Sequence, residues 1–175
     1  MSQVQIMEAV QVIQATEQYN SFSSGLGAIT DGEVHFSKGL SAFEDYKSFT
    51  YRKEMRLKPF IYMHSTHNND VSFVCVDPFI LTPEYKVELF PAVIENLGLR
   101  NAEDAIVLSL VSVGKDMYTT TANLMSPIVI NPVTMKAEQV FMEDLGIEYL
   151  RYNVWDSIGK YTSLSVKTQS RLEAN

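Results

Sequence analysis

The 175-residue sequence lacks most features that mark secreted, membrane-spanning and nucleotide-binding proteins. Its one cysteine, Cys75, excludes an intramolecular disulfide, which is typical of a protein kept in a reducing compartment. No run approaches the roughly 18 apolar residues that a membrane helix needs, and the N-terminus has no basic start before an apolar core. The glycines do not have dinucleotide-loop spacing. We therefore expect a cytoplasmic protein with no membrane association and no cofactor.

Residues that could bind a metal or catalyse a reaction are also scarce. Three histidines are present, and His64 and His67 form a candidate metal constellation with Asp70. Their segment, HSTHNND, is rich in turn formers, whereas only a helix would place positions i and i+3 on one face. We predict a polar turn between two strands, no bound metal and no catalytic site. Two alternatives stay open: an enzyme that uses His64, His67 or Cys75, and a β-barrel that binds a small ligand inside.

Acidic residues exceed basic ones, and the excess lies in one part of the chain. The formal net charge is −7, and residues 77–148 carry eleven acidic against four basic side chains. The segments before and after this part sum to −2 and +2. Such a surface repels nucleic acid and favours basic partners, although acidic surfaces also serve solubility. We therefore expect no direct contact with nucleic acid.

Short apolar or alternating runs, separated by turn formers, predict a chain built mainly of strands. The predicted strands are residues 10–16, 34–36, 48–51, 59–64, 71–76, 105–113, 117–124, 128–130, 137–142 and 149–155. A hairpin turn signal, Asp31-Gly32, precedes the second of them. We expect 105–113 to pair antiparallel with 117–124, and 128–130 with 137–142. The sequence thus predicts a mainly β fold, a single compact antiparallel β-barrel-like domain.

One or two short helices are predicted at the edge of this barrel. Thr82 is a suitable N-cap, Pro83 a first helical residue and Glu84 a favourable first-turn acid, so a helix is expected to begin there. A second helix is expected at residues 92–97, where Gly98 can end it. Beyond residue 155 the chain becomes rich in Ser, Thr and Lys, with few apolar residues. We therefore expect a β domain at residues 1–155 and a polar C-terminal tail at residues 156–175.

Four stretches carry a resemblance to a known family. They are KGLSAFEDYKSF (38–49), FVCVDPF (73–79), LTPEY (81–85) and TANLMSPIVINP (121–132). With these stretches in this order, the chain from about residue 34 to residue 151 resembles the bacterial flagellar assembly factor family, FliW. Ser37 stands where that family usually has proline, and Ala42 where it usually has glycine. The resemblance implies a compact β-barrel-like fold with short helices at its edge.

The resemblance also implies a function. Proteins of this family bind flagellin in the cytoplasm, and they bind the small RNA-binding regulator CsrA, whose repression of flagellin translation they relieve. The implied mechanism is partner switching, in which accumulated flagellin occupies this protein and frees CsrA to silence the flagellin message. Secretion of flagellin reverses the switch. On this basis we expect a binding protein that is not an enzyme.

Candidate contact residues follow from the chemistry that each partner needs and, for Asn123, Pro127 and Asn131, from positions that match the family. A basic RNA-binding edge on CsrA would be attracted to acidic residues between 77 and 148. The amphipathic C-terminal part of flagellin would need an apolar surface, which flexible methionines can supply, although core filling and turn formation are the alternative uses. The candidate contact residues are Glu84, Glu88, Glu103, Asp104, Met117, Asn123, Leu124, Met125, Pro127, Asn131, Met135 and Glu138.

Overall fold

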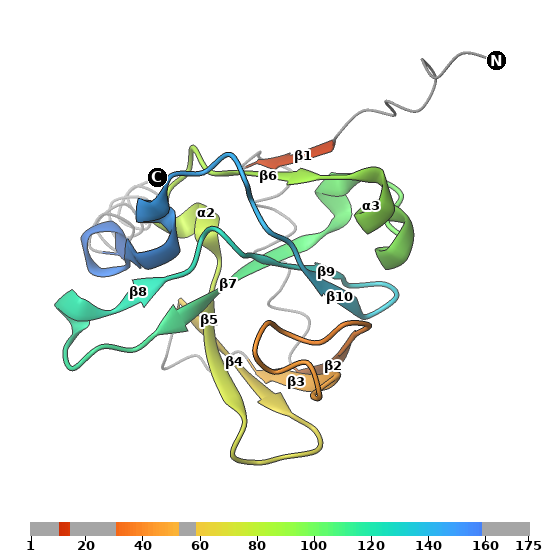
Figure 1. The fold of residues 1–175 in the computed structure, drawn as a ribbon, viewed down its shortest axis with the longest axis horizontal. Coiled ribbons are helices and arrows are strands. Elements are labelled where there is room, and N and C mark those ends of the chain that lie inside the picture. The colour runs from red at the N-terminus through yellow and green to blue at the C-terminus, as the bar shows by residue number, and fades with distance from the viewer. Residues whose placement is uncertain (1–10, 15–30, 53–58, 159–175) are drawn as a thin grey trace, which may run out of the picture.

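A closed β-barrel forms the centre of the structure, a computed structural model that describes residues 11–14, 31–52 and 59–158. Its strands are β2 (Asp31–Phe36), β3 (Ser48–Arg52), β4 (Phe60–Ser65), β5 (Ser72–Val76), β7 (Ile106–Ser112), β9 (Ile128–Asn131) and β10 (Lys136–Gln139). The ring runs β7, β5, β4, β3, β2, β10, β9, and β9 pairs again with β7 (Figure 1). Around it, β2 and β10 are parallel and the other neighbours antiparallel. The predicted barrel-like fold is therefore confirmed.

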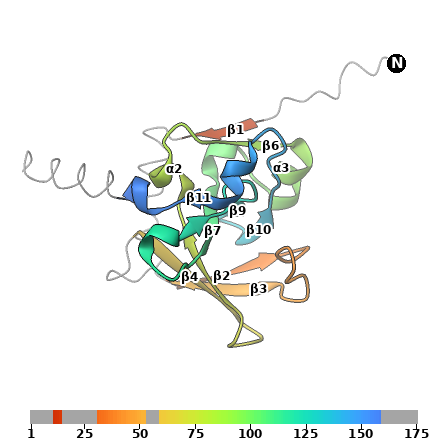
Figure 2. The ribbon, with the colours of Figure 1, turned by 60° about the vertical axis from the view of Figure 1, so that its left-hand side comes forward.

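Further short elements surround the barrel. They are β1 (Gln11–Gln14), α2 (Pro78–Leu81), β6 (Lys86–Leu89), α3 (Pro91–Leu97), η2 (Ala102–Asp104), η3 (Met117–Thr119), β8 (Thr121–Ala122), η4 (Ile147–Arg151) and β11 (Tyr152–Asn153). β1 and β6 pair antiparallel as a separate ribbon, whereas β8 and β11 extend the barrel sheet beyond β7. Both views place the β1–β6 ribbon, with α2 and α3, on the side of the molecule away from β2 and β3 (Figures 1 and 2).

Alternate side chains of the barrel strands fill the barrel interior. Successive residues of a strand point to opposite faces, so β7 sends Ile106 and Leu108 inward and Val107 outward. All seven barrel strands contribute to the inner cluster, and full burial of one such side chain stabilises the fold by about 1.5–3 kcal/mol. The buried members of the inner core are Val34, Phe36, Leu40, Phe49, Tyr51, Ile61, Met63, Cys75, Ile106, Leu108, Ile128, Ile130 and Ala137.

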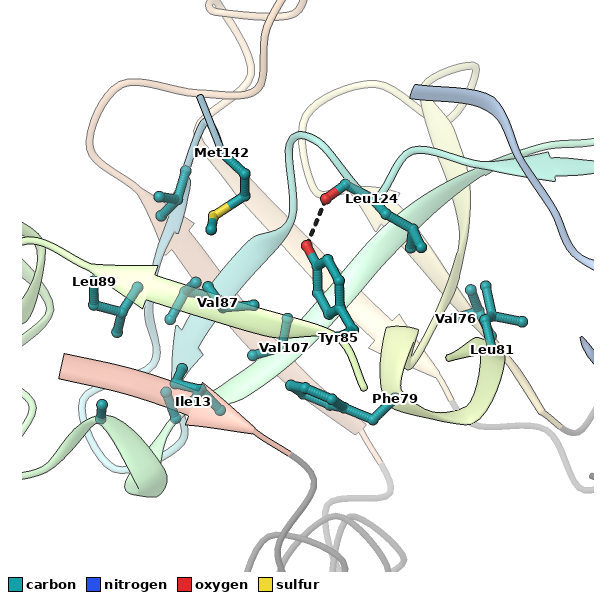
Figure 3. Packing of buried hydrophobic residues seen from close by; sticks show 14 of the residues in the cluster. Ile13, Val76, Phe79, Leu81, Tyr85, Val87, Leu89, Val107, Leu124 and Met142 are labelled. Carbon is teal, nitrogen blue, oxygen red and sulfur yellow. Dashed lines mark hydrogen bonds between the residues drawn. The ribbon is translucent and has the colours of Figure 1, made fainter. Parts of the chain in front are cut away.

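A second core lies between the outer wall of the barrel and the layer that covers it. Ile13 of β1 and Val87 of β6 are fully buried there and pack toward Val107 of β7 (Figure 3). Tyr85 is also buried, and its hydroxyl donates a hydrogen bond to the Leu124 carbonyl. β7 thus packs on both faces, which explains its continuous apolar sequence.

The first helix begins five residues earlier than the sequence suggests. The prediction placed the N-cap at Thr82, but the N-cap is Asp77, whose side chain accepts a hydrogen bond from the Phe79 N–H at 2.9 Å, and Thr82 ends the helix. Both Asp-Pro and Thr-Pro are N-cap signals, and the second is overridden because the following residues pair with β1 as β6. The second predicted helix is confirmed as α3, which ends at Gly98 with a φ of 67°.

The Asp31-Gly32 pair forms part of β2 and not the expected turn. Gly32 lies opposite Tyr51 in the register of β2 with β3. A Cβ atom at Gly32 would lie 2.7 Å from the Tyr51 hydroxyl, so the glycine is required by close packing of the tyrosine. The turn prediction failed because glycine serves turns and close approaches equally well.

Several strand boundaries also differ from the prediction. The predicted antiparallel pairing of 105–113 with 117–124 is confirmed by β7 and β8, but β8 is only Thr121–Ala122, because a 3₁₀ turn, η3, forms at Met117–Thr119. Likewise η4 replaces the start of predicted strand 149–155. The 128–130 and 137–142 pairing is confirmed by β9 and β10, and β1 confirms the core of strand 10–16. The predicted tail beyond Ile158 lies outside the described residues.

Candidate functional site

The stretch TANLMSPIVINP (121–132) supplies both buried apolar side chains and polar side chains that hydrogen-bond to the backbone. Asn123 Oδ1 accepts hydrogen bonds from the Met125 and Ser126 N–H groups, both at 3.1 Å, and so shapes the turn before β9. Pro127 is buried, and its carbonyl accepts a hydrogen bond from Val140 at 2.9 Å. These contacts set where β9 begins and hold it beside β10.

Asn131 fastens the end of α3 to the turn between β9 and β10. Its side chain is buried, and Nδ2 donates to the Leu97 and Gly98 carbonyls, both at 3.0 Å. Its Oδ1 accepts from the Val133 N–H at 2.9 Å and from Thr134. One amide therefore satisfies carbonyls at a helix C-terminus and amide groups in a turn.

Several of the candidate contact residues are buried and therefore cannot contact a partner in the folded protein. The interior of the structure contains Leu124, Met125, Pro127 and Asn131. A partner could reach these side chains only if the fold opened, so we do not retain them as contact residues. Asn123 and Met135 are half-buried, and Met135 packs against the inner core.

Met117 lies in a different setting, at the tip of the β7–β8 hairpin. This hairpin extends away from the barrel (Figure 1). Val113, Met117 and Tyr118 are 70%, 50% and 64% exposed. The Tyr118 ring packs edge-on against Trp155 with centroids 5.4 Å apart, and the Asn153 amide donates to the Tyr118 carbonyl at 2.9 Å. We call Val113, Met117, Tyr118 and Trp155 the hairpin patch.

The predicted acidic residues divide between two places. Glu84 and Glu88 are exposed beside and on β6, and Glu103 is exposed on η2. The Ala102 N–H of η2 donates to Gln11 of β1 at 2.9 Å, which brings Glu103 to the β1–β6 ribbon. We call Glu84, Glu88 and Glu103 the acidic ribbon face.

Two of the predicted acids have structural partners instead. Asp104 is half-buried and forms a capping box with Asn101, whose N–H donates to Asp104 Oδ2 at 3.3 Å. Glu138 lies on β10, away from the ribbon, and accepts from Lys38 Nζ at 3.1 Å. Neither residue belongs to the acidic ribbon face.

The FliW family model, described as FliW protein, matches residues 20–152, more than three-quarters of the chain. This chain belongs to the FliW family. Relatives named flagellar assembly factor FliW include one from Syntrophus aciditrophicus, 35% identical over 131 residues, which cover 74% of this chain and 82% of that protein. Another from Caldicellulosiruptor saccharolyticus is 31% identical over 125 residues, 71% of this chain and 81% of that protein.

A solved structure supports the same assignment at the level of the fold. The crystal structure of the flagellar assembly factor FliW aligns with a TM-score of 0.61 and 26% sequence identity. The alignment covers 77% of this chain and 84% of that structure. β1 lies before the first residue matched by the FliW family model, yet Ile13 is fully buried in the outer core.

The three residues of the enzymatic alternative lie in different environments: the barrel interior for Cys75, strand β4 for His64 and the β4–β5 turn for His67. Cys75 is buried in the barrel interior, and burial raises the pKa of its thiol to about 12, so the thiol is protonated at neutral pH. His64 is half-buried and stacks on Tyr62, whereas His67 is exposed in the β4–β5 turn. Among the residues that the structure describes, no three His, Cys, Asp or Glu side chains gather as metal ligands.

Large side chains occupy the space that the ligand-barrel alternative would need. Phe36 and Phe49 meet edge to face inside the barrel, with ring centroids 5.5 Å apart. Phe73 packs on Phe49, and Phe43 of the loop after β2 packs on Phe73 at 4.9 Å. This row of rings runs from the interior to the loop, so the barrel is a packed core.

Within the described ranges, no helix has the length and apolarity needed to span a bilayer.

Proposed function

We propose that this protein is a cytoplasmic flagellar assembly factor that switches between flagellin and a CsrA-type RNA-binding regulator. The observation that carries the proposal is membership of the FliW family over residues 20–152, with relatives named flagellar assembly factors. When flagellin accumulates, it occupies the protein and frees CsrA, which then silences the flagellin message. When flagellin is secreted, the protein captures CsrA again and translation resumes.

The acidic ribbon face is the proposed contact for CsrA. Its three carboxylates are exposed and outnumber Lys86, the exposed base between Glu84 and Glu88, so they create a negative potential without a desolvation cost in the free protein. An RNA-binding edge is basic, because it must neutralise phosphates. An acidic partner beside that edge attracts the regulator and repels its RNA, which supports the antagonism that we propose.

The hairpin patch is the proposed contact for flagellin. Methionine, tyrosine and tryptophan are enriched at protein interfaces, and tyrosine and tryptophan dominate interface hot spots. An amphipathic helix binds through its apolar face, which a flexible apolar surface can accommodate. In the assembled filament the terminal helices of flagellin are already packed, so we expect the protein to bind monomeric flagellin and not the filament.

Charge reversal tests the CsrA contact. Glu84→Lys with Glu88→Lys should slow CsrA association several-fold and change its dissociation little, because peripheral charges mainly steer encounter. Association with the unaltered protein should weaken with salt, since charges more than about 8 Å apart are screened at physiological ionic strength. The matched control is Glu143→Lys with Asp144→Lys, two exposed acids beyond β10. Equal effects of the two variants on CsrA association, measured by surface-based kinetics, would reject the ribbon face.

Truncation of the hairpin patch tests the flagellin contact. Met117→Ser with Tyr118→Ala should weaken binding of monomeric flagellin by about tenfold or more, because both side chains are exposed and hot-spot residues of these types cost over about 1.4 kcal/mol. Val133→Ser is the matched control, since Val133 is 87% exposed in the turn after β9. Calorimetry should give unchanged flagellin affinity for the control and unchanged CsrA affinity for the patch variant. Undiminished flagellin binding by the patch variant would place the contact elsewhere.

A further inference from the structure

A cavity of about 330 Å³ lies where α3 meets the parallel strands β2 and β10. Lys136 of β10 is in register with His35 of β2, so both side chains are on the outer face of the barrel. Lys136 Nζ also donates to the Asn96 carbonyl at the end of α3, at 3.4 Å, which closes one side. We call this cavity the α3–β10 pocket. It is lined by His35, Ser37, Lys38, Asn96, Leu97, Lys136, Ala137 and Glu138.

Glu138 in this pocket has an unused hydrogen-bond acceptor. Its side chain is only 11% exposed, and its Oε1 is held by Lys38 Nζ at 3.1 Å. The other oxygen, Oε2, is buried and has no hydrogen-bond partner among the described residues. An ionised carboxylate oxygen left without a donor is costly, so a ligand that supplies an N–H group would be favoured.

The pocket also offers hydrogen-bond donors to an anion. Lys38 and Lys136 each have three ammonium protons, and each makes one hydrogen bond that the structure describes. His35 is exposed and its Nδ1 lies 3.2 Å from the Ser48 hydroxyl, whereas its Nε2 makes no hydrogen bond to a described residue. Two lysines against one carboxylate leave a local excess of positive charge in a chain whose net charge is −7. Glu138 at the bottom of the pocket can therefore accept a hydrogen bond from a ligand, and Lys38 and Lys136 at its edge can bind an anionic group.

We propose that the α3–β10 pocket binds a free α-carboxylate whose neighbouring N–H group donates to Glu138. The carboxylate would lie between the ammonium groups of Lys38 and Lys136. Lys38 is 73% exposed, so its side chain is free to turn toward the ligand and uncover Glu138. A volume of about 330 Å³ is at the lower limit of ligand pockets, which suits a free amino acid or the last residues of a peptide chain. This inference does not depend on the partners proposed above.

Titration of the full chain with small probes tests the proposal. Three probes are compared. Acetyl-alanyl-alanine has both the α-carboxylate and the neighbouring N–H group. The same dipeptide amidated at its C-terminus lacks the negative charge, and acetate lacks the N–H group. In ¹H–¹⁵N NMR spectra, the free acid should cause saturable shifts at Leu97, Ala137 and Glu138. The amide and acetate should each bind at least about tenfold more weakly, because each lacks one of the two charge-assisted contacts. Free alanine distinguishes the two natural sources, since tighter binding of alanine than of the dipeptide would identify an amino acid and not a chain end.

Variants locate the site. Lys136→Met should abolish saturation by the free acid, and Lys136→Arg should restore it. Glu138→Gln should lower the affinity for the dipeptide to that for acetate. Lys115→Met, at the exposed tip of the β7–β8 hairpin, is the matched control and should bind as the original chain does. Equal binding of acid and amide, no saturable shift, or unchanged binding by Lys136→Met would overturn the proposal.

Discussion

Ala42 adopts the left-handed backbone conformation, with a φ of 67°, which glycine adopts without steric cost. This conformation costs a residue with a side chain about 1–2 kcal/mol, whereas glycine loses about 0.4–1 kcal/mol more chain entropy on folding. We therefore expect Ala42→Gly to raise the free energy of unfolding by about 0.5–1 kcal/mol. Ala92→Gly in α3 is the control and should lower it by a similar amount. Urea denaturation measures both, and a destabilised Ala42→Gly would show that the strain is relieved elsewhere.

Asn131 illustrates a signature residue whose role is internal. Asn131→Asp removes two hydrogen bonds to backbone carbonyls and places a carboxylate against them, so it should lower the free energy of unfolding by about 2–4 kcal/mol. The affinity of the folded fraction for flagellin and CsrA should not change, because Asn131 is 4% exposed. Asn69→Asp, in the exposed β4–β5 turn, should change stability by less than about 0.5 kcal/mol. Thermal melts with binding titrations separate the two roles, and lost affinity without lost stability would restore Asn131 as a contact.

At the scale of elements, local signals predicted several features that depend on residues close together in the chain. The β9–β10 pair and the Gly98 end of α3 belong to this class. β6 does not, because it pairs with β1, for example Gln11 with Leu89, across more than seventy residues of sequence, and no local pattern indicates that pairing. The helix predicted from Thr82 failed for that reason. The hairpin patch was found only through Met117, since the exposure of Val113 and Tyr118 depends on how far the hairpin projects.

The packing of β1 on the outer core can be tested by shortening its one fully buried side chain. Ile13 is fully buried against the outer core, so Ile13→Ala should destabilise the protein by about 2–4 kcal/mol through lost burial and a cavity. Val12, on the opposite face, is 39% exposed, and Val12→Ala should cost less than about 1 kcal/mol. For a chain of this length, Ile13→Ala corresponds to a melting temperature lower by about 4–16 °C. Equal effects of the two variants in calorimetry would mean that β1 does not pack on β6 in solution.

At the scale of the whole molecule, the two proposed contacts belong to separate elements. The acidic ribbon face is formed around β1 and β6, and the hairpin patch lies on the projecting β7–β8 hairpin (Figure 1). The interior of the barrel is filled by its own side chains. Competition between the partners would therefore arise from overlap of bulky partners or from a change of shape. In either case the effect on binding free energy must be reciprocal, so CsrA should weaken flagellin binding by the same factor as flagellin weakens CsrA binding.

Displacement of CsrA by flagellin is the measurement that tests partner switching most directly. Labelled CsrA is bound to the full chain, monomeric flagellin is added, and release of CsrA is followed by fluorescence anisotropy. We predict that monomeric flagellin releases CsrA in a saturable way, that assembled filament does not, and that Met117→Ser with Tyr118→Ala blocks the release. A stable complex of all three proteins, with the affinity for CsrA unchanged by saturating flagellin, would contradict it.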